Sequence, residues 1–151
     1  MAWVISVILV ALDQISKYFA HRFVAPDDVV RVLPFLNIVN LRNPGAAFGI
    51  LQNVGNIFFV IISAAAIIAV IVMLAKSRKK PVGLVLVLSG AAGNLTDRLY
   101  LGYVRDFIDV HAGPMHWPAF NFADSYLSIG IALLLIGSLL NVKNEPGDLK
   151  K

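Results

Sequence analysis

The sequence predicts an all-α membrane protein with four transmembrane helices and a small extracytoplasmic β-region between helices 1 and 2. Its 151 residues are 58% hydrophobic and only 15% charged, and the mean hydropathy is +0.77. Soluble domains are about 45–50% apolar and about 25% charged. Four segments are apolar over the roughly 20 residues that a helix needs to cross a bilayer. We therefore expect a single integral membrane domain over residues 1–151.

The four predicted spans cover residues 3–22, 57–75, 82–101 and 120–140. The first span is not preceded by a basic segment and is not followed by a small-residue cleavage site, so it is predicted to be a retained helix rather than a secretory signal. The second span contains no charged residue, and the fourth ends before the polar tail "NVKNEPGDLKK". No internal repeat is visible.

The basic residues predict the orientation of these helices. Four of the thirteen lie in "KSRKK", residues 76–80, between the second and third spans. Basic short loops stay in the cytoplasm, so both termini are predicted to be cytoplasmic and segments 24–56 and 103–119 to lie outside. The net charge of +4 comes without a basic patch interleaved with aromatic residues, and no nucleic-acid partner is expected. The chain has no cysteine, which excludes a disulfide framework and a cysteine nucleophile.

The first outer segment, "VLPFLNIVNLRNPGAAFGILQN", is too interrupted to span the membrane. Its β-branched residues, broken by Pro34 and Pro44, predict one or two short strands followed by a glycine-rich turn. In the second outer segment, Trp117 is predicted to lie at the membrane interface.

Polar residues converge at the outer ends of three spans and in the following loop. Ionisable residues inside a membrane are costly and are candidates for function by default. Helix periodicity places the members of each group on a common face. The groups are Asp13, Gln14 and Lys17; Asn94, Asp97 and Arg98; Asn121, Asp124, Ser125 and Ser128; and the loop residues Asp106 and Asp109.

Structural interpretations of the same residues stay open. Asp13 and Lys17 lie one turn apart and could form a helix-stabilising pair. Asp97 and Arg98 could form a buried ion pair, and Asn121 could cap the fourth helix. Asp109 is expected to face water.

Two close carboxyl groups could hydrolyse a peptide bond. They cannot both ionise cheaply, so they share a proton; one activates water while the other protonates the scissile carbonyl. His111 and His116 show no metal-ligand spacing, and neither a metal nor another cofactor is expected. The same acids would suit a proton-coupled transporter, although that class favours acids near the midplane and often has an internal repeat. A purely structural membrane subunit is the third alternative.

Five blocks together resemble the lipoprotein signal peptidase family, signal peptidase II. They are "DQISK" at 13–17, "NPGAAFG" at 43–49, "GAAGNLTDR" at 90–98, "VRDFID" at 104–109 and "FNFADS" at 120–125. The resemblance implies an aspartyl endopeptidase of the bacterial cytoplasmic membrane, with its active site near the outer leaflet surface. It implies removal of the signal peptide from prolipoproteins, on the N-terminal side of a diacylglyceryl-modified cysteine. We expect a monomer whose partners are these prolipoproteins and membrane lipids.

The resemblance also implies a role for each matching residue. The catalytic pair would be Asp106 and Asp124, with Asp97 as the alternative catalytic acid. The supporting residues would order this pair, brace it from the first helix or line the substrate groove; they are Asn94, Asp97, Arg98 and Asn121, then Asp13 and Lys17, then Asn43 and Phe48.

Overall fold

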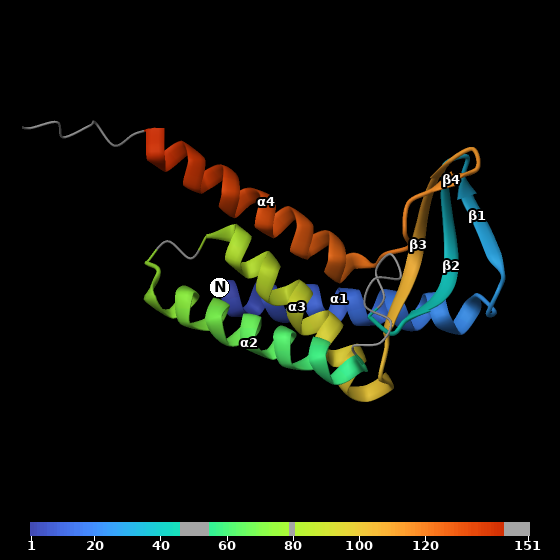
Figure 1. The fold of residues 1–151 in the computed structure, drawn as a ribbon, viewed down its shortest axis with the longest axis horizontal. Helices are drawn as coiled ribbons and strands as arrows, with labels where there is room; N and C mark the ends of the chain where they lie inside the picture. Colours follow the sequence, from blue (N-terminus) through green and yellow to red (C-terminus); the bar gives the residue numbers. More distant parts are fainter. Residues whose placement is uncertain (46–54, 79–80, 144–151) are drawn as a thin grey trace, which may run out of the picture.

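The structure is a computed structural model that describes residues 1–45, 55–78 and 81–143. It contains four helices and four strands in the described residues: α1 (Ala2–Phe23), β1 (Val29–Leu33), β2 (Leu36–Asn43), α2 (Gly55–Lys76), α3 (Val82–Leu101), β3 (Val104–Ala112), β4 (Met115–His116) and α4 (Phe122–Lys143). The helices run side by side, and the sheet lies across one end of them (Figure 1). The predicted spans agree with the helices to within a few residues.

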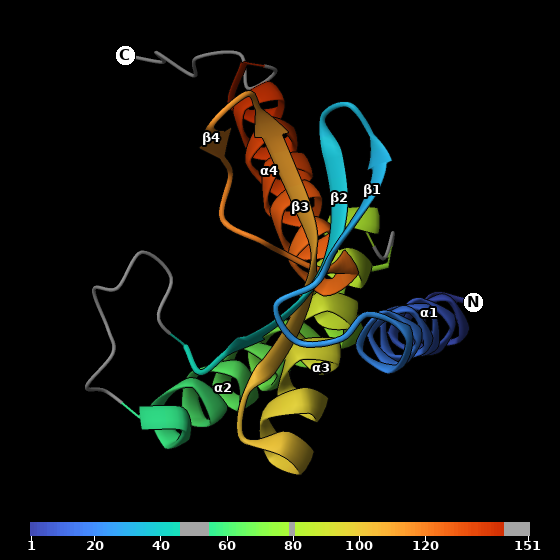
Figure 2. The ribbon, with the colours of Figure 1, turned by 90° about the vertical axis from the view of Figure 1, so that its right-hand side faces the viewer.

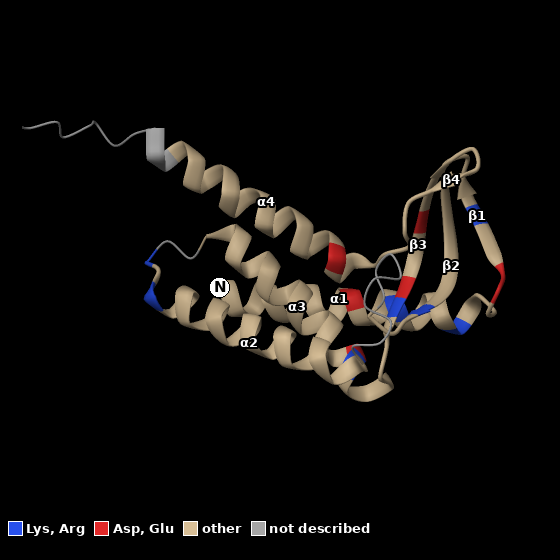
Figure 3. Cartoon of the chain, in the orientation of Figure 1, with Lys and Arg blue, Asp and Glu red and all other residues tan. Residues whose placement is uncertain are grey.

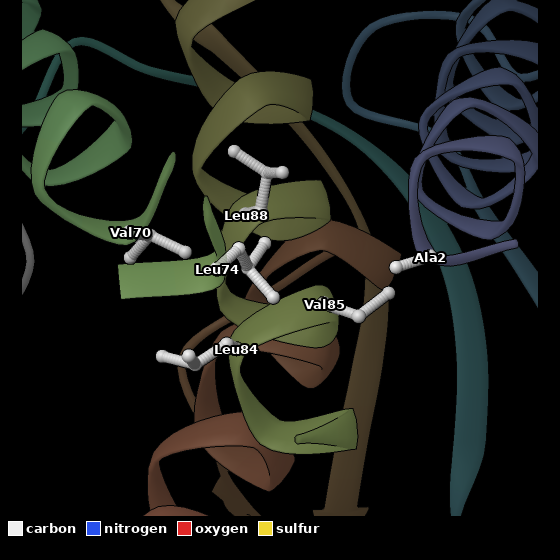
Figure 4. Packing of buried hydrophobic residues seen from close by; sticks show 6 residues of the cluster. All are labelled: Ala2, Val70, Leu74, Leu84, Val85 and Leu88. Carbon is white, nitrogen blue, oxygen red and sulfur yellow. The ribbon is translucent and has the colours of Figure 1, made fainter. Parts of the chain in front are cut away.

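Helix α3 is the centre of the helical layer, because it contacts α1, α2 and α4. A small hydrophobic core packs the N-terminal half of α3 against α2 and the start of α1. The core residues Ala2, Val70, Leu74, Leu84, Val85 and Leu88 point toward one another in Figure 4. Most other apolar side chains of the helices are exposed, as expected for surfaces that face lipid.

Glycine lets α3 approach its neighbours closely at two positions near the sheet end. A Cβ atom on Gly90 would collide with the Ala123 carbonyl of α4. A Cβ atom on Gly93 would lie 2.6 Å from Oδ2 of Asp13 in α1. Small residues at such crossings allow close helix packing in membranes. Here they also make room for a polar side chain between the helices.

The sheet has the order β1-β2-β3-β4 and is antiparallel throughout (Figure 2). Leu41 of β2 is the register partner of Asp106, and a bulge interrupts the pairing between Ile38 and Leu41. Phe120, just before α4, forms a bridge with Ile108 of β3. This bridge brings the start of α4 against the middle of β3.

The prediction that the β-region lies between helices 1 and 2 is incomplete. β3 and β4 come from the segment between α3 and α4, which we expected to be a loop. The run from Val104 to Val110 is rich in β-branched and aromatic residues and is bounded by Gly102 and Gly113, a typical strand signal. Gly102 ends α3 in a left-handed conformation, with φ of 82°, as is common at helix C-termini.

Among the residues that the structure describes, three helices are long and apolar enough to cross a membrane, namely α1, α2 and α4 over Phe122–Leu140. α3 is of similar length but carries Asn94, Asp97 and Arg98 in its C-terminal half. Because α3 is surrounded by the other helices, it exposes less of its length to lipid. In Figure 3, the charged segments lie near the sheet end and at the α2–α3 connection, and the helix bodies between them are uncharged.

Candidate active site

Asp106 lies on β3 with both carboxyl oxygens hydrogen-bonded to amides. Asn121 donates from Nδ2 to Oδ1 over 2.7 Å, and Asn43 donates from Nδ2 to Oδ2 over 2.9 Å. Asn43 is two residues beyond Leu41, the register partner of Asp106, so Asn43 and Asp106 share a face of the sheet. Burial, together with the negative charge of Asp124, raises the pKa of Asp106 to about 6.

Asp124 lies in the first turn of α4. Its Oδ1 accepts a hydrogen bond from Asn94 Nδ2 over 2.8 Å, and its Oδ2 accepts one from the Asn121 backbone N–H over 3.2 Å. In return, Asn121 Oδ1 accepts from the Asp124 N–H over 2.9 Å. This reciprocal pair is a capping box, so the prediction that Asn121 caps the helix is confirmed.

Asn121 connects the two carboxyl groups. Its side chain binds Asp106, its backbone N–H binds Asp124, and its own exposure is 0%. The bridge between Phe120 and Ile108 sets Asn121 next to β3. The start of α4 therefore brings Asp124 to the same residue, Asn121, that binds Asp106, although the two acids come from different elements.

Lys17 and Asp13 form the predicted ion pair, with Nζ 2.8 Å from Asp13 Oδ2 and both side chains fully buried. The pair is more than a helix-stabilising contact. Lys17 Nζ also donates to Asn94 Oδ1 over 2.9 Å and lies 3.5 Å from Asp97 Oδ2. Asp13 Oδ1 accepts from the Ala123 N–H over 2.9 Å. Through these contacts α1 holds both α3 and the start of α4.

The predicted pair between Asp97 and Arg98 is wrong. Asp97 instead binds Arg105, whose Nη2 lies 2.6 Å from Asp97 Oδ1. The Arg98 guanidinium lies over the ring of Phe59, 4.6 Å from its centre. Adjacent residues of a helix project about 100° apart, which separates these side chains even though their charges are opposite.

Arg105 was not recognised as a site residue from the sequence, and Gln14 was placed among the converging polar residues without an assigned role. Arg105 Nη2 donates to Gln14 Oε1 over 2.9 Å, and Gln14 Nε2 donates to the Gly93 carbonyl over 3.0 Å. The available signal was the position of Arg105 directly before Asp106 in the block "VRDFID".

Asp109 does not face water as expected. It is 7% exposed, accepts a hydrogen bond from Asn37 Nδ2 over 2.8 Å, and lies 2.8 Å from Nδ1 of His116. Burial tends to raise the pKa of Asp109, but the hydrogen bonds from Asn37 and His116 outweigh it and hold that pKa below its usual value. The rings of His116 and His111 stack with centroids 4.9 Å apart.

The structure thus brings together eight of the predicted site residues through direct contacts. They are Asp13, Lys17, Asn43, Asn94, Asp97, Asp106, Asn121 and Asp124. Arg98 lies apart from their hydrogen bonds, and Phe48 lies outside the described residues. A cleft of about 340 Å³ opens beside Asp124, lined by Trp117, Phe120, Ser125, Ser128 and Ile129. In residues 1–45, 55–78 and 81–143, no three His, Asp or Glu side chains gather as metal ligands would.

This arrangement can perform general acid–base chemistry. A group that catalyses proton transfer works best when its pKa lies near the operating pH, and the pKa of Asp106 lies near 6. The cleft gives Asp124 access to a bound molecule. The acids lie near the sheet end of the helices (Figure 3), whereas a coupled transporter usually places them at the midplane.

Comparisons with known proteins identify a peptidase family. The sequence model of the family described as Signal peptidase (SPase) II matches residues 5–140. A lipoprotein signal peptidase of Thermodesulfovibrio yellowstonii is 46% identical over 136 residues, covering 89% of this chain and 92% of the relative. One from Acinetobacter baumannii is 42% identical over 149 residues, covering 94% and 85%.

Two solved structures, both described as bacterial membrane enzymes, share the fold. The first has a TM-score of 0.86 at 36% identity and covers 99% of this chain and 94% of its own. The second has a TM-score of 0.80 at 37% identity and covers 91% and 92%. With the family match over most of its length, this chain belongs to the signal peptidase II family of membrane peptidases.

Proposed function

We propose that this protein is an intramembrane aspartyl endopeptidase that removes signal peptides from diacylglyceryl-modified bacterial prolipoproteins. Cleavage would occur on the N-terminal side of the lipid-modified cysteine. The observation that carries the proposal is the connection of Asp106 and Asp124 through Asn121, combined with a pKa of about 6 for Asp106. The pair can therefore hold one shared proton near neutral pH.

In the proposed reaction, the ionised carboxylate takes a proton from water, the water oxygen adds to the scissile carbonyl carbon, and the protonated carboxyl donates to the carbonyl oxygen. The tetrahedral diol then collapses: the C–N bond breaks, the newly protonated acid donates to the leaving amine nitrogen, and the other carboxylate takes back a hydroxyl proton, which restores both acids. Asn43, Asn94 and Asn121 orient the two groups with hydrogen bonds. No metal or other cofactor is needed for these steps, and cleavage should persist in EDTA.

Arg98 is proposed to contribute to the order of the catalytic pair and to bind the substrate backbone. Its Nη1 is buried and has no hydrogen-bond partner among the residues that the structure describes. A guanidinium N–H of this kind can donate to a backbone carbonyl of a bound peptide. Asn43 and Phe48 are proposed to line the substrate groove.

The membrane setting explains the position of the acids. We propose that all four helices span the bacterial cytoplasmic membrane, with both termini in the cytoplasm and the sheet outside. A diacylglyceryl chain would hold the neighbouring peptide bond at the outer leaflet surface. The acids at the outer ends of the helices then lie at the depth where that bond arrives. We expect the monomer, surrounded by lipid, to be the active form.

The proposal is tested by incubating the purified protein with a prolipoprotein that carries the diacylglyceryl cysteine. A matched substrate without the lipid is the control. We expect the lipid-modified form to be shortened at the bond preceding the cysteine and the unmodified form to stay intact. Cleavage of neither substrate, or cleavage that EDTA abolishes and zinc restores, would contradict the proposal.

The orientation is tested separately with two exposed positions, Asp28 before β1 and Arg78 after α2. Asp28→Cys should react with a membrane-impermeant thiol reagent added to intact spheroplasts, and Arg78→Cys should react only after permeabilisation. The chain has no native cysteine to interfere. Labelling of both positions from one side would overturn the proposed topology.

A further inference from the structure

Arg105 lies in β3, directly before Asp106, and its side chain extends from the sheet to the helical layer. Its side chain and backbone bind one carboxylate, Asp97 of α3. Nη2 lies 2.6 Å from Oδ1, Nε lies 3.3 Å from Oδ2, and the backbone N–H lies 3.0 Å from Oδ2. Nη2 also reaches Gln14 of α1 over 2.9 Å. The first residues of β3 are therefore fastened to two helices.

Arg105 also balances charge in the buried network. Asp13 and Asp97 are the two acids of this network, and Lys17 and Arg105 are the two bases that contact them. Lys17 lies closer to Asp13 and Asn94, at 2.8 and 2.9 Å, than to Asp97, at 3.5 Å. Buried charges need such compensation, because removing one partner leaves the other desolvated and unpaired. Arg105 supplies most of the compensation for Asp97.

We propose that Arg105 is a positioning residue of the active site: by pairing with Asp97, it leaves Lys17 on Asn94 and so keeps the Asn94 amide on Asp124. The inference rests on the proposed peptidase function. Asn94 transmits the effect because its Oδ1 accepts from Lys17 and its Nδ2 donates to Asp124. Arg105 has a second, direct effect, since its carbonyl accepts from the Asn121 side chain over 3.3 Å.

Loss of the guanidinium has a defined consequence. Asp97 would be left with Lys17 as its cation, and the ammonium would move toward it and away from Asn94. The Asn94 amide would lose the contact that fixes its orientation, and Asp124 would lose an oriented donor. A displacement of about 1 Å in a catalytic group can reduce turnover about 100-fold. Substrate binding in the cleft beside Asp124 would change little, because neither Arg105 nor Asp97 lines it.

The test compares Arg105→Gln and Arg105→Lys with wild type on the lipid-modified prolipoprotein. We expect Arg105→Gln to lower kcat about 100-fold with KM little changed. Arg105→Lys should recover part of the loss, because it restores the charge without the fork of donors. Arg42→Gln is the matched control. Arg42 is the register partner of Arg105 on β2, but its side chain lies over Tyr103, 5.2 Å from the ring centre, so its kcat should equal that of wild type.

The double variant Arg105→Gln with Asp97→Asn separates positioning from simple destabilisation. It removes one charge of each sign, so Lys17 can stay on Asn94, and kcat should exceed that of Arg105→Gln alone. The uncompensated Asp97 of the single variant should also move the pH profile of kcat to higher pH, and the double variant should reverse this shift. The pH profile is the readout that distinguishes positioning from destabilisation, because a smaller folded fraction lowers the rate without moving the pH profile of kcat.

Unchanged kcat in Arg105→Gln, or a double variant less active than the single one, would overturn the inference while wild-type cleavage leaves the proposed function intact. A wild-type protein that fails to cleave would refute both.

Discussion

Asp106 and Asp109 lie three residues apart on β3, and the environment gives them opposite properties. Both are buried, at 3% and 7% exposure, and the spacing directs them to opposite faces of the strand. The pKa of Asp106 is raised to about 6, whereas that of Asp109 is lowered. One strand therefore carries a carboxyl group that can hold a proton near neutral pH and another that stays ionised.

The partners explain the difference better than burial does. Burial favours the protonated form of both acids. At Asp106 the charge of Asp124 acts in the same direction, and the amides of Asn43 and Asn121 offset only part of the shift. At Asp109 the Asn37 amide and the His116 imidazole reverse it. A second carboxylate thus raises the pKa of Asp106 toward the range needed for proton transfer. Hydrogen bonds from an amide and an imidazole lower the pKa of Asp109 and stabilise its anion.

The largest expected difference between the two acids is in cleavage. Asp106→Asn and Asp124→Asn should each reduce cleavage roughly a thousandfold or more, and the double variant should be hardly worse, because the two groups act as a unit. Asp109→Asn removes a buried carboxylate from the same strand and should retain most activity. The measurement is the rate at which each of these four variants cleaves the lipid-modified prolipoprotein, compared with wild type.

Retained binding of a substrate-like lipopeptide controls for folding in these variants. An active Asp106→Asn protein together with an inactive Asp97→Asn protein would transfer the catalytic role to Asp97. Such a result would also remove the functional half of the comparison between Asp106 and Asp109.

The next expected effect is on the pH dependence of stability. The pKa of Asp106 rises from 3.8 to about 6 on folding, so the folded protein binds the proton more tightly than the unfolded chain. Its contribution to stability is full below the unfolded pKa and is lost as the pH rises through the folded pKa, a loss of about 3 kcal/mol. Wild type should lose thermal stability over this window, and Asp106→Asn should lose less.

Thermal unfolding in detergent, measured across that pH window for both proteins, tests the sign. A wild-type protein that gains stability over the same window relative to Asp106→Asn would show that Asp106 is ionised at lower pH than its surroundings imply.

Much of the layout was predictable from the sequence for physical reasons. The bilayer thickness fixes the length of an apolar helix, so the span near 57–75 was predicted to within two residues at its start and one at its end. Alternating helix direction predicted that polar groups of three spans meet at one end. The contacts of Lys17 with Asn94 and of Asn94 with Asp124 join α1, α3 and α4 and bear this out.

Other features depend on the path of the chain in three dimensions. The ion pair of Asp97 with Arg105 joins a helix to a strand that was not predicted, and spacing along α3 favoured the wrong arginine. Asp109 became buried because β2 and β4 flank its strand and supply Asn37 and His116. Sequence spacing cannot show which face of a short strand its neighbours cover. The predicted role of Phe48 stays a prediction, since that residue is outside the described part of the chain.

A smaller effect is expected from removing the Asp109 carboxylate altogether. Asp109→Ala leaves the Asn37 amide without its acceptor, a loss of about 1–3 kcal/mol for a buried donor. Because the pKa of Asp109 is lowered, its stabilisation is present above the unfolded pKa and disappears as the pH falls through the folded pKa. Thermal unfolding of wild type and variant should therefore differ at neutral pH and converge in acid. A difference that grows in acid would contradict the ionised assignment.

The smallest expected effect belongs to His116, the other partner of Asp109. Its side chain is 51% exposed, and ion pairs at exposed positions contribute only about 0.2–1 kcal/mol. His116→Gln should therefore lower thermal stability slightly and leave cleavage unchanged, because Asn37 still binds Asp109. Added salt should reduce the difference, since screening weakens an exposed pair. His111→Gln, which removes the stacked ring without touching Asp109, is the control for loss of packing. If His116→Gln abolished cleavage while His111→Gln did not, the Asp109 cluster would belong to the active site, and the contrast between the two acids of β3 would have to be abandoned.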